Sequence, residues 1–196
     1  MPTVPSRANI RAAVCAAALL CAGALDAGAQ VIESATRGQI SLTAGGLYTA
    51  FQPDYAGGGI AQGSPYRLYG GGAYVDVKLT RWIQLEGEGR WLRFNSFIDI
   101  TEDNYLIGPR VPIHRFRLLR ATPYGKVLLG MGKMTFDYNS AYGHFTDIAY
   151  GGGVDLQVTK RISVRAIDFE YQQWPNWING TLNPYGVSVG IGYKVF

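Results

Sequence analysis

Few residues in this chain could do chemistry. The only two histidines are His114 and His144, and His144 is followed by Thr146 and Asp147. A hydroxyl nucleophile needs a base and an orienting acid within hydrogen-bond reach, and spacing along the chain does not by itself provide that. We therefore expect no catalytic residues and no enzyme.

Phosphate-binding and metal-binding patterns are also weak. In the segment GMGKM at 130–134, a methionine stands where a phosphate-binding loop needs the Ser or Thr that holds the metal. Asp99, Glu102 and Asp103 could hold a divalent cation, but three acids in an expected loop are more often simply hydrated. We predict neither a metal site nor a cofactor.

The more informative charges alternate with apolar residues. Between residues 146 and 159, Ile148, Tyr150 and Val154 share one face of an extended chain, while Asp147 and Asp155 lie on the other. A period of two predicts a β-strand with one apolar face. Charges that recur on the second face favour a sheet whose apolar side is turned outward.

Eight segments show this alternation. They are expected at about 37–51, 67–80, 82–94, 104–111, 122–136, 146–159, 162–172 and 184–196. A join as short as Arg81 predicts an antiparallel hairpin, whereas the connections 52–66, 95–103, 137–145 and 173–183 are long and rich in Gly, Asn, Asp, Pro and aromatics. Short joins are therefore expected at one rim of a sheet and long loops at the other.

The seventh segment contains a change of phase. Val164 and Ala166 share the apolar face, and strict alternation would add Asp168 and Glu170 to it. A β-bulge at residues 166–167 would instead turn both acids to the polar face. We predict that bulge.

The N-terminal residues lie outside this pattern. Two arginines, an apolar run over 12–25 and small residues at 27 and 29 predict a secretory signal peptide over 1–29, followed by a lead-in over 30–36 and one domain over 37–196. Cys21 is disfavoured as a lipid acceptor because Leu20 precedes it. The formal net charge of +4 is too mild to predict a nucleic-acid partner.

Three motifs carry a family resemblance: LEGEGRW at 85–91, YGGGVD at 150–155 and VSVGIGY at 187–193. With the terminal Phe196, they make the chain similar to the OmpA/OmpX-type family of small outer-membrane β-barrels. The resemblance implies an all-β, eight-stranded, antiparallel up-and-down transmembrane β-barrel in the outer membrane of a Gram-negative-type bacterium. The implied partners are outer-membrane lipid, lipopolysaccharide and the assembly machinery that reads Phe196. In the family an aromatic and the terminal Phe share a face, but here the spacing predicts opposite faces for Tyr193 and Phe196.

The charges expected on the inner face of such a barrel are balanced, six of each sign. They are Asp76, Glu86, Glu88, Asp155, Asp168 and Glu170, against Lys78, Arg90, Arg110, Lys126, Arg165 and Lys194. An eight-stranded barrel is about wide enough inside for side chains, and charges sealed there must be paired. The sequence therefore predicts a structural ionic plug. The alternative, a selective pore, would show one dominant sign of charge or an open path.

Aromatic residues near strand ends predict the interfacial girdles of a membrane barrel. They are Trp82, Trp91, Tyr105, Tyr171, Trp174, Tyr185 and Tyr193. The basic segment 112–121, with His114, Arg115, Arg117 and Arg120, is expected to be a hydrated turn. Its alternative role is to grip anionic lipid headgroups.

Function is then left to the long loops. The segments 136–145 and 172–179 are rich in Tyr, Trp and Asn, which suits contact with surfaces, sugars or proteins from a rigid mount. We expect a structural envelope-integrity role or an adhesion-like surface interaction. The alternatives are a small channel and a lipid A-modifying enzyme, the latter because His144 and Thr146 distantly resemble the His-x-Ser motif of lipid A deacylase barrels.

Overall fold

The computed structural model describes residues 40–54, 67–94, 100–113, 116, 120–136, 141–177 and 180–196. By its contacts the chain separates into residues 1–38 and 39–196, and the described residues all belong to the second unit. The predicted signal peptide and lead-in, Asp99, His114, Arg115 and Arg117 lie outside the described residues. Within the ranges given, no helix is long and apolar enough to cross a membrane.

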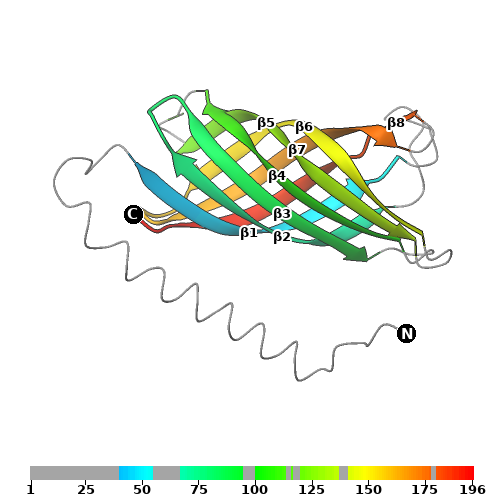
Figure 1. Ribbon diagram of the computed structural model, residues 1–196. Helices are drawn as coiled ribbons and strands as arrows, with labels where there is room; N and C mark the ends of the chain where they lie inside the picture. The colour runs from blue at the N-terminus through cyan, green and yellow to red at the C-terminus, as the bar shows by residue number, and fades with distance from the viewer. Residues whose placement is uncertain are drawn as a thin grey trace, which may run out of the picture. The chain divides into compact units, whose positions relative to one another are not determined.

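A single antiparallel sheet closes on itself (Figure 1). Its strands are β1 (Ser41–Gln52), β2 (Leu68–Lys78), β3 (Gln84–Phe94), β4 (Ile100–Pro112), β5 (Ala121–Phe136), β6 (Ala141–Gln157), β7 (Ile162–Trp177), β8 (Gly180–Leu182) and β9 (Tyr185–Lys194). Strands β1 to β7 pair in chain order, and β9 closes the ring between β7 and β1. The short strand β8 pairs with the end of β7 alone. The closed barrel therefore has the eight strands that the alternation predicts.

The apolar side chains of this barrel face outward. Val75 and Val189 are exposed and Ile107 is 57% exposed, whereas Asp76 and Ser188, one residue away on the same strands, are buried. Water as solvent would favour the reverse arrangement, whereas a lipid bilayer accepts an apolar exterior on a closed barrel, which leaves no sheet edge unpaired. The predicted inside-out alternation is confirmed.

At the loop end, the strands extend several residues further than predicted. β4 and β6 begin earlier and β7 ends later, so the predicted loops 95–103, 137–145 and 173–183 were too long. These segments look like loops by their Gly, Asn, Asp and aromatic content, yet they keep the period of two and pair with neighbouring strands. The prediction of hydrated loop acids was also wrong: Asp103 pairs with Arg93, and Glu102 is fully buried.

The strands differ in length. β5, β6 and β7 have 16, 17 and 16 residues, whereas β2 and β3 have 11. A transmembrane strand needs about 9–11 residues, so β5 to β7 exceed the membrane span. At the loop end of β6 the outward residues are polar, His144 and Thr146, while the next outward residues are Ile148 and Tyr150. The excess length therefore lies at the loop end.

Ala166 is an extra residue in β7. The ladder with β6 passes from Arg165 to Ile167 with a shift in register, and the ladder with β9 shifts at the same place. Ala166 and Ile167 are both exposed, whereas Asp168 and Glu170 are fully buried. The predicted bulge is confirmed, and it places both acids in the lumen.

Two short hairpins use the same side-chain device. Thr80 Oγ1 accepts hydrogen bonds from the backbone N–H groups of Trp82 (3.2 Å) and Ile83 (3.0 Å). Thr159 Oγ1 accepts equivalent bonds from the second and third residues after it, at 3.2 and 2.9 Å. We had predicted that a strand begins at Trp82. Trp82 lies in the turn instead, and the strand begins at Gln84.

The C-terminal residues contain a second irregularity. Leu42 donates its backbone N–H to the carbonyl of Phe196 (3.3 Å) and accepts a hydrogen bond from the N–H of Val195 (2.8 Å). Val195 and Phe196 thus both lie opposite Leu42. When two residues of one strand lie opposite a single residue of its neighbour, the alternation of side chains changes phase at that point. The side chains of residues 193–196 are all exposed, so opposite faces for Tyr193 and Phe196 stay a prediction.

Candidate functional site

The half of the lumen near the short turns is built on two arginines. Arg110 contacts Asp76 (2.6 Å) and also pairs with Asp155. Arg165 contacts Glu86 (3.0 Å) and Asp76 (3.1 Å). These five residues come from five strands, β2, β3, β4, β6 and β7, so the contacts tie the barrel wall together across its interior.

Lys126 occupies the centre of the lumen. Its ammonium lies 2.9 Å from Glu86, 3.1 Å from Glu88, 2.8 Å from Asp168 and 3.1 Å from Glu170, and all five side chains are buried. Three of these carboxylates, Glu86, Glu88 and Asp168, are close enough together to hold a metal ion. The Lys126 ammonium already supplies the positive charge at that point.

Arg90 shares two of these carboxylates, Glu88 and Glu170, with Lys126. It donates two hydrogen bonds to Glu170, one of them 2.9 Å long between Nη2 and Oε2, and it lies 2.9 Å from Glu88. The side chain of Arg90 is completely buried. Bidentate pairing of an arginine with a carboxylate is among the strongest ion-pair geometries in proteins.

Aromatic rings and glycines make room for this network. The guanidinium of Arg165 lies 3.8 Å from the ring centroid of Tyr74, and that of Arg110 lies 3.6 Å from the ring of Tyr124. A Cβ at Gly153 would meet the Tyr124 hydroxyl at 2.7 Å. The glycine run on β6 therefore admits the ring that packs against Arg110, and cation–π contact supplements the ion pairs.

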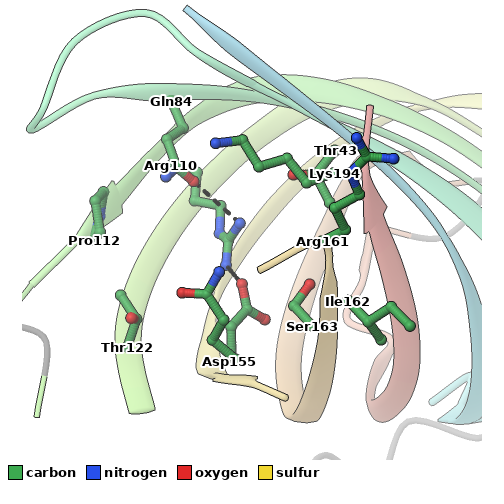
Figure 2. A pocket seen from close by; sticks show the side chains of 11 residues that line it. Thr43, Gln84, Arg110, Pro112, Thr122, Asp155, Arg161, Ile162, Ser163 and Lys194 are labelled. Carbon is green, nitrogen blue, oxygen red and sulfur yellow. Dashed lines mark hydrogen bonds and ion pairs between the residues drawn. The ribbon is translucent and has the colours of Figure 1, made fainter. Parts of the chain in front are cut away.

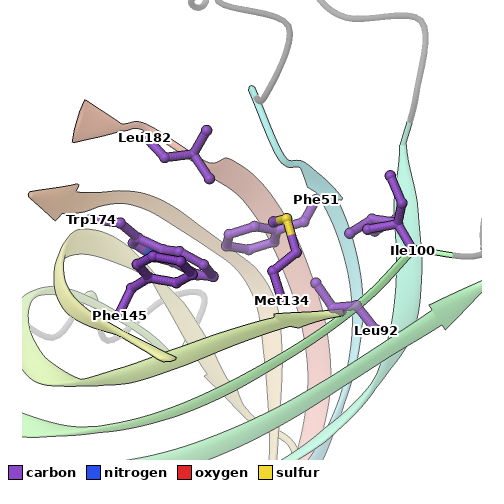
Figure 3. Close-up of a cluster of buried hydrophobic side chains, with 8 residues drawn as sticks. Phe51, Leu92, Ile100, Met134, Phe145, Trp174 and Leu182 are labelled. Atoms are coloured by element: carbon purple, nitrogen blue, oxygen red, sulfur yellow. The ribbon is translucent and has the colours of Figure 1, made fainter. Parts of the chain in front are cut away.

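The loop end of the lumen is closed by apolar side chains, which we call the apolar stopper. Its members are Phe51, Leu68, Leu92, Ile100, Met134, Phe145, Trp174 and Leu182, with Trp177 packed against them. Phe145 and Trp174 stack with centroids 5.7 Å apart (Figure 3). Trp174 is fully buried here, so its predicted place in an interfacial girdle was wrong. Because β7 continues to Trp177, residue 174 keeps the inward phase of Gln172.

The structure brings ten of the twelve predicted lumen charges into one network. Lys78 and Lys194 are the exceptions: neither makes an ion pair with a described residue, and both line small cavities at the short-turn mouth. The larger cavity has a volume of about 150 Å³, and Figure 2 shows Lys194 at its edge, with Arg110 bonded to Gln84 and Asp155. We had predicted that both side chains face inward, but each lysine is the last residue of its strand and neither is buried.

Sequence reasoning missed four polar residues that lie between the ionic network and the apolar stopper. They are Glu102, Asn104, Asp147 and Gln172, all buried. Asp147 was assigned to the inner face but left out of the expected network, and Glu102 was assigned to a loop. Counting back from Arg110 along β4 in steps of two residues would have placed Asn104 and Glu102 on the inner face.

The other predicted girdle aromatics lie outside the lumen. Trp82, Trp91, Tyr105 and Tyr193 are exposed, and Tyr171 and Tyr185 are partly exposed. The Trp91 indole donates a 3.0 Å hydrogen bond to the Tyr105 hydroxyl on the next strand. The candidate His144 and Thr146 are also exposed, but Asp147 is buried on the opposite face of β6. Asp147 therefore cannot orient His144.

Comparison with known proteins agrees with this architecture. Residues 13–194 match the outer membrane protein beta-barrel domain family, and no curated protein matches the chain. Neisserial surface protein A has a similar structure, with a TM-score of 0.56 and 10% identity over 80% of this chain and 97% of that one. OprG of Pseudomonas aeruginosa gives 0.48 and 12% over 80% and 95%. Ail of Yersinia pestis, solved with the heparin analogue sucrose octasulfate, gives 0.48 and 18% over 79% and 97%.

Proposed function

Because the chain belongs to the outer membrane protein beta-barrel domain family, we propose that it is a closed barrel of the outer membrane whose role is carried by its surface loops. That role is envelope integrity or an adhesion-like contact with a surface partner. The barrel itself serves as a rigid mount, which is the usual relation between a scaffold and functional loops.

The filled lumen is the observation that carries this proposal. The ionic network occupies the short-turn half and the centre, and the apolar stopper occupies the loop end. A channel of this size would need a continuous wet path, and the described side chains fill the interior instead. A role in transport through the lumen is therefore the less favoured alternative.

Orientation and partners follow from the same family. In outer-membrane barrels the short turns face the periplasm and the long connections face outward. We infer export through the signal peptide at 1–29, insertion by the assembly machinery that reads Phe196, and contact of the apolar exterior with outer-membrane lipid and lipopolysaccharide. We propose no catalytic role, because His144 and Asp147 lie on opposite faces of β6.

Planar-bilayer recording tests the closed lumen. The refolded barrel is expected to give no stable single-channel steps, because the ionic network and the apolar stopper lie in series along its axis. Conductance steps that disappear on changing Glu86 or Arg165 would contradict the proposal and favour a pore. Heat-modifiable gel migration of the same sample verifies that a folded barrel was tested.

The loops are tested separately by binding. Purified barrel is expected to bind an immobilised matrix or envelope component, and replacement of 55–66 by a short Gly-Ser turn is expected to weaken that binding. A variant with Lys78→Gln at the opposite mouth serves as the control. Equal binding by the loop variant and the wild type would count against loop-borne function.

A further inference from the structure

The described lumen contains more buried acids than buried bases. Seven carboxylates on barrel strands are buried: Asp76, Glu86, Glu88, Glu102, Asp147, Asp168 and Glu170. Four bases face them: Arg90, Arg110, Lys126 and Arg165. Five of the seven acids share these bases in ion pairs, and Glu102 and Asp147 make none with any described residue. We had predicted equal numbers of positive and negative charges in the lumen. Among the buried residues of the described strands, acids instead outnumber bases.

The two unpaired acids belong to one polar layer. Asn104 donates from its amide nitrogen to Glu102 (2.9 Å) and to Gln172 (3.3 Å). The indole N–H of Trp174 donates to the same Gln172 oxygen at 3.1 Å and also faces Asp147. The layer thus runs from β4 across the lumen to β6 and β7. The adjoining base, Arg90, is already engaged by two other carboxylates.

Oxygen atoms in this layer lack donors. One oxygen of Glu102 and the side-chain carbonyl of Asn104 have no hydrogen-bond partner. The Trp174 indole approaches Asp147, but neither carboxylate oxygen of Asp147 accepts a hydrogen bond of ordinary geometry, and all three side chains are at most 1% exposed. We call these three residues the outer oxygen cluster. A carboxylate sealed from water is strongly unfavourable as an anion unless a positive charge joins it or a proton neutralises it.

Glycines on β5 lie beside two members of the cluster. Asn104 on β4 pairs with Gly132 on β5, and Asp147 on β6 pairs with Gly130 on β5. The intervening strand β5 therefore contributes no side chain of its own at these two positions, and the ring of Trp174, from β7, packs over Gly132. The cluster is bounded by the apolar stopper on one side and the Arg90 ion pairs on the other.

We infer that the outer oxygen cluster binds one divalent metal cation of the calcium type. Its unpartnered donors are all oxygen, and its two carboxylates would match the charge of such an ion. Ca²⁺ accepts oxygen ligands in irregular geometry more readily than Mg²⁺ does. Bound there, it would offset two of the three excess negative charges among the buried residues and cross-link β4 to β6. This inference does not depend on which role the loops have.

The test compares thermal unfolding of the full refolded chain in detergent, refolded either with CaCl₂ or with EDTA. In EDTA, Asp147→Asn is expected to be more stable than wild type, because the variant removes a buried unpaired charge. In calcium the order is expected to reverse. Calorimetry is expected to give one Ca²⁺ per wild-type barrel and, with Asp147→Asn or Glu102→Gln, about tenfold weaker binding or worse, because calcium affinity follows the number of charged ligands.

Asp103→Asn is the matched control, since Asp103 neighbours Glu102 on β4 but pairs with Arg93 outside the cluster. It should bind calcium like the wild type. Two results would overturn the inference: equal loss of binding in Asp103→Asn, or a wild-type barrel that neither binds Ca²⁺ nor changes its unfolding temperature. The second result would mean that protons or water neutralise the cluster instead.

Discussion

Replacing Lys126 with methionine is expected to lower the free energy of unfolding of the barrel by about 3–5 kcal/mol, the usual cost of removing one partner from a buried ionic cluster. Methionine fills a similar volume, so the loss is electrostatic. Four carboxylates within 3.1 Å of the ammonium would lose their shared cation. Urea unfolding in lipid vesicles, followed by tryptophan fluorescence, measures this change.

Lys78→Met provides the control for that prediction. Lys78 lies at the short-turn mouth and makes no ion pair with a described residue, so its loss should change stability by less than about 0.5 kcal/mol, as for most surface substitutions. If the two lysine variants unfold at the same urea concentration, the Lys126 contacts do not stabilise the barrel. The ionic network would then be only a filling of the lumen.

Deletion of Ala166 is expected to prevent formation of the barrel. Without the extra residue, either Asp168 and Glu170 or the preceding Arg165 must turn toward lipid. An arginine on the lipid face costs about 2–4 kcal/mol at the bilayer midplane, and acids cost less. The ion pairs of these residues to Glu86, Lys126 and Arg90 would be lost as well. Heat-modifiable gel migration should therefore disappear.

Ala166→Gly is the counterpart of that deletion. It keeps the residue count and the phase of β7, so heat-modifiable migration should persist. A folded barrel from the deletion variant would show that the bulge can move along β7, and that its observed position does not fix the inward phase of Asp168 and Glu170.

The wall of the barrel could be predicted because lipid on one side and packed side chains on the other leave little freedom to each strand residue. The phase of β7 illustrates this: two acids on the lipid side were unfavourable enough to predict an extra residue at 166–167. Strand ends were less predictable. Where β4, β6 and β7 leave the membrane, both faces can be polar, so Glu102 looked like a loop residue and Trp174 like an interfacial anchor.

The sequence was sufficient to predict which charged side chains face the interior, but not which of them form ion pairs with one another. Alternation assigns Arg90 and Glu170 to the lumen, yet their contact joins β3 to β7 across the barrel and depends on side-chain reach. Depth was equally uncertain. Lys78 and Lys194 have the right phase but lie too close to the mouth to meet a carboxylate, whereas Asp147 lies deep enough to be sealed.

The long strands β5, β6 and β7 continue beyond the span that a bilayer covers. In the proposed orientation, the first surface met from outside the cell would therefore include hydrogen-bonded sheet as well as loop. His144 and Lys133, paired across β5 and β6, stand on that sheet. An antibody raised against the folded protein should then recognise a conformational epitope there. Such an antibody would lose its target on boiling, and synthetic loop peptides would not compete for it.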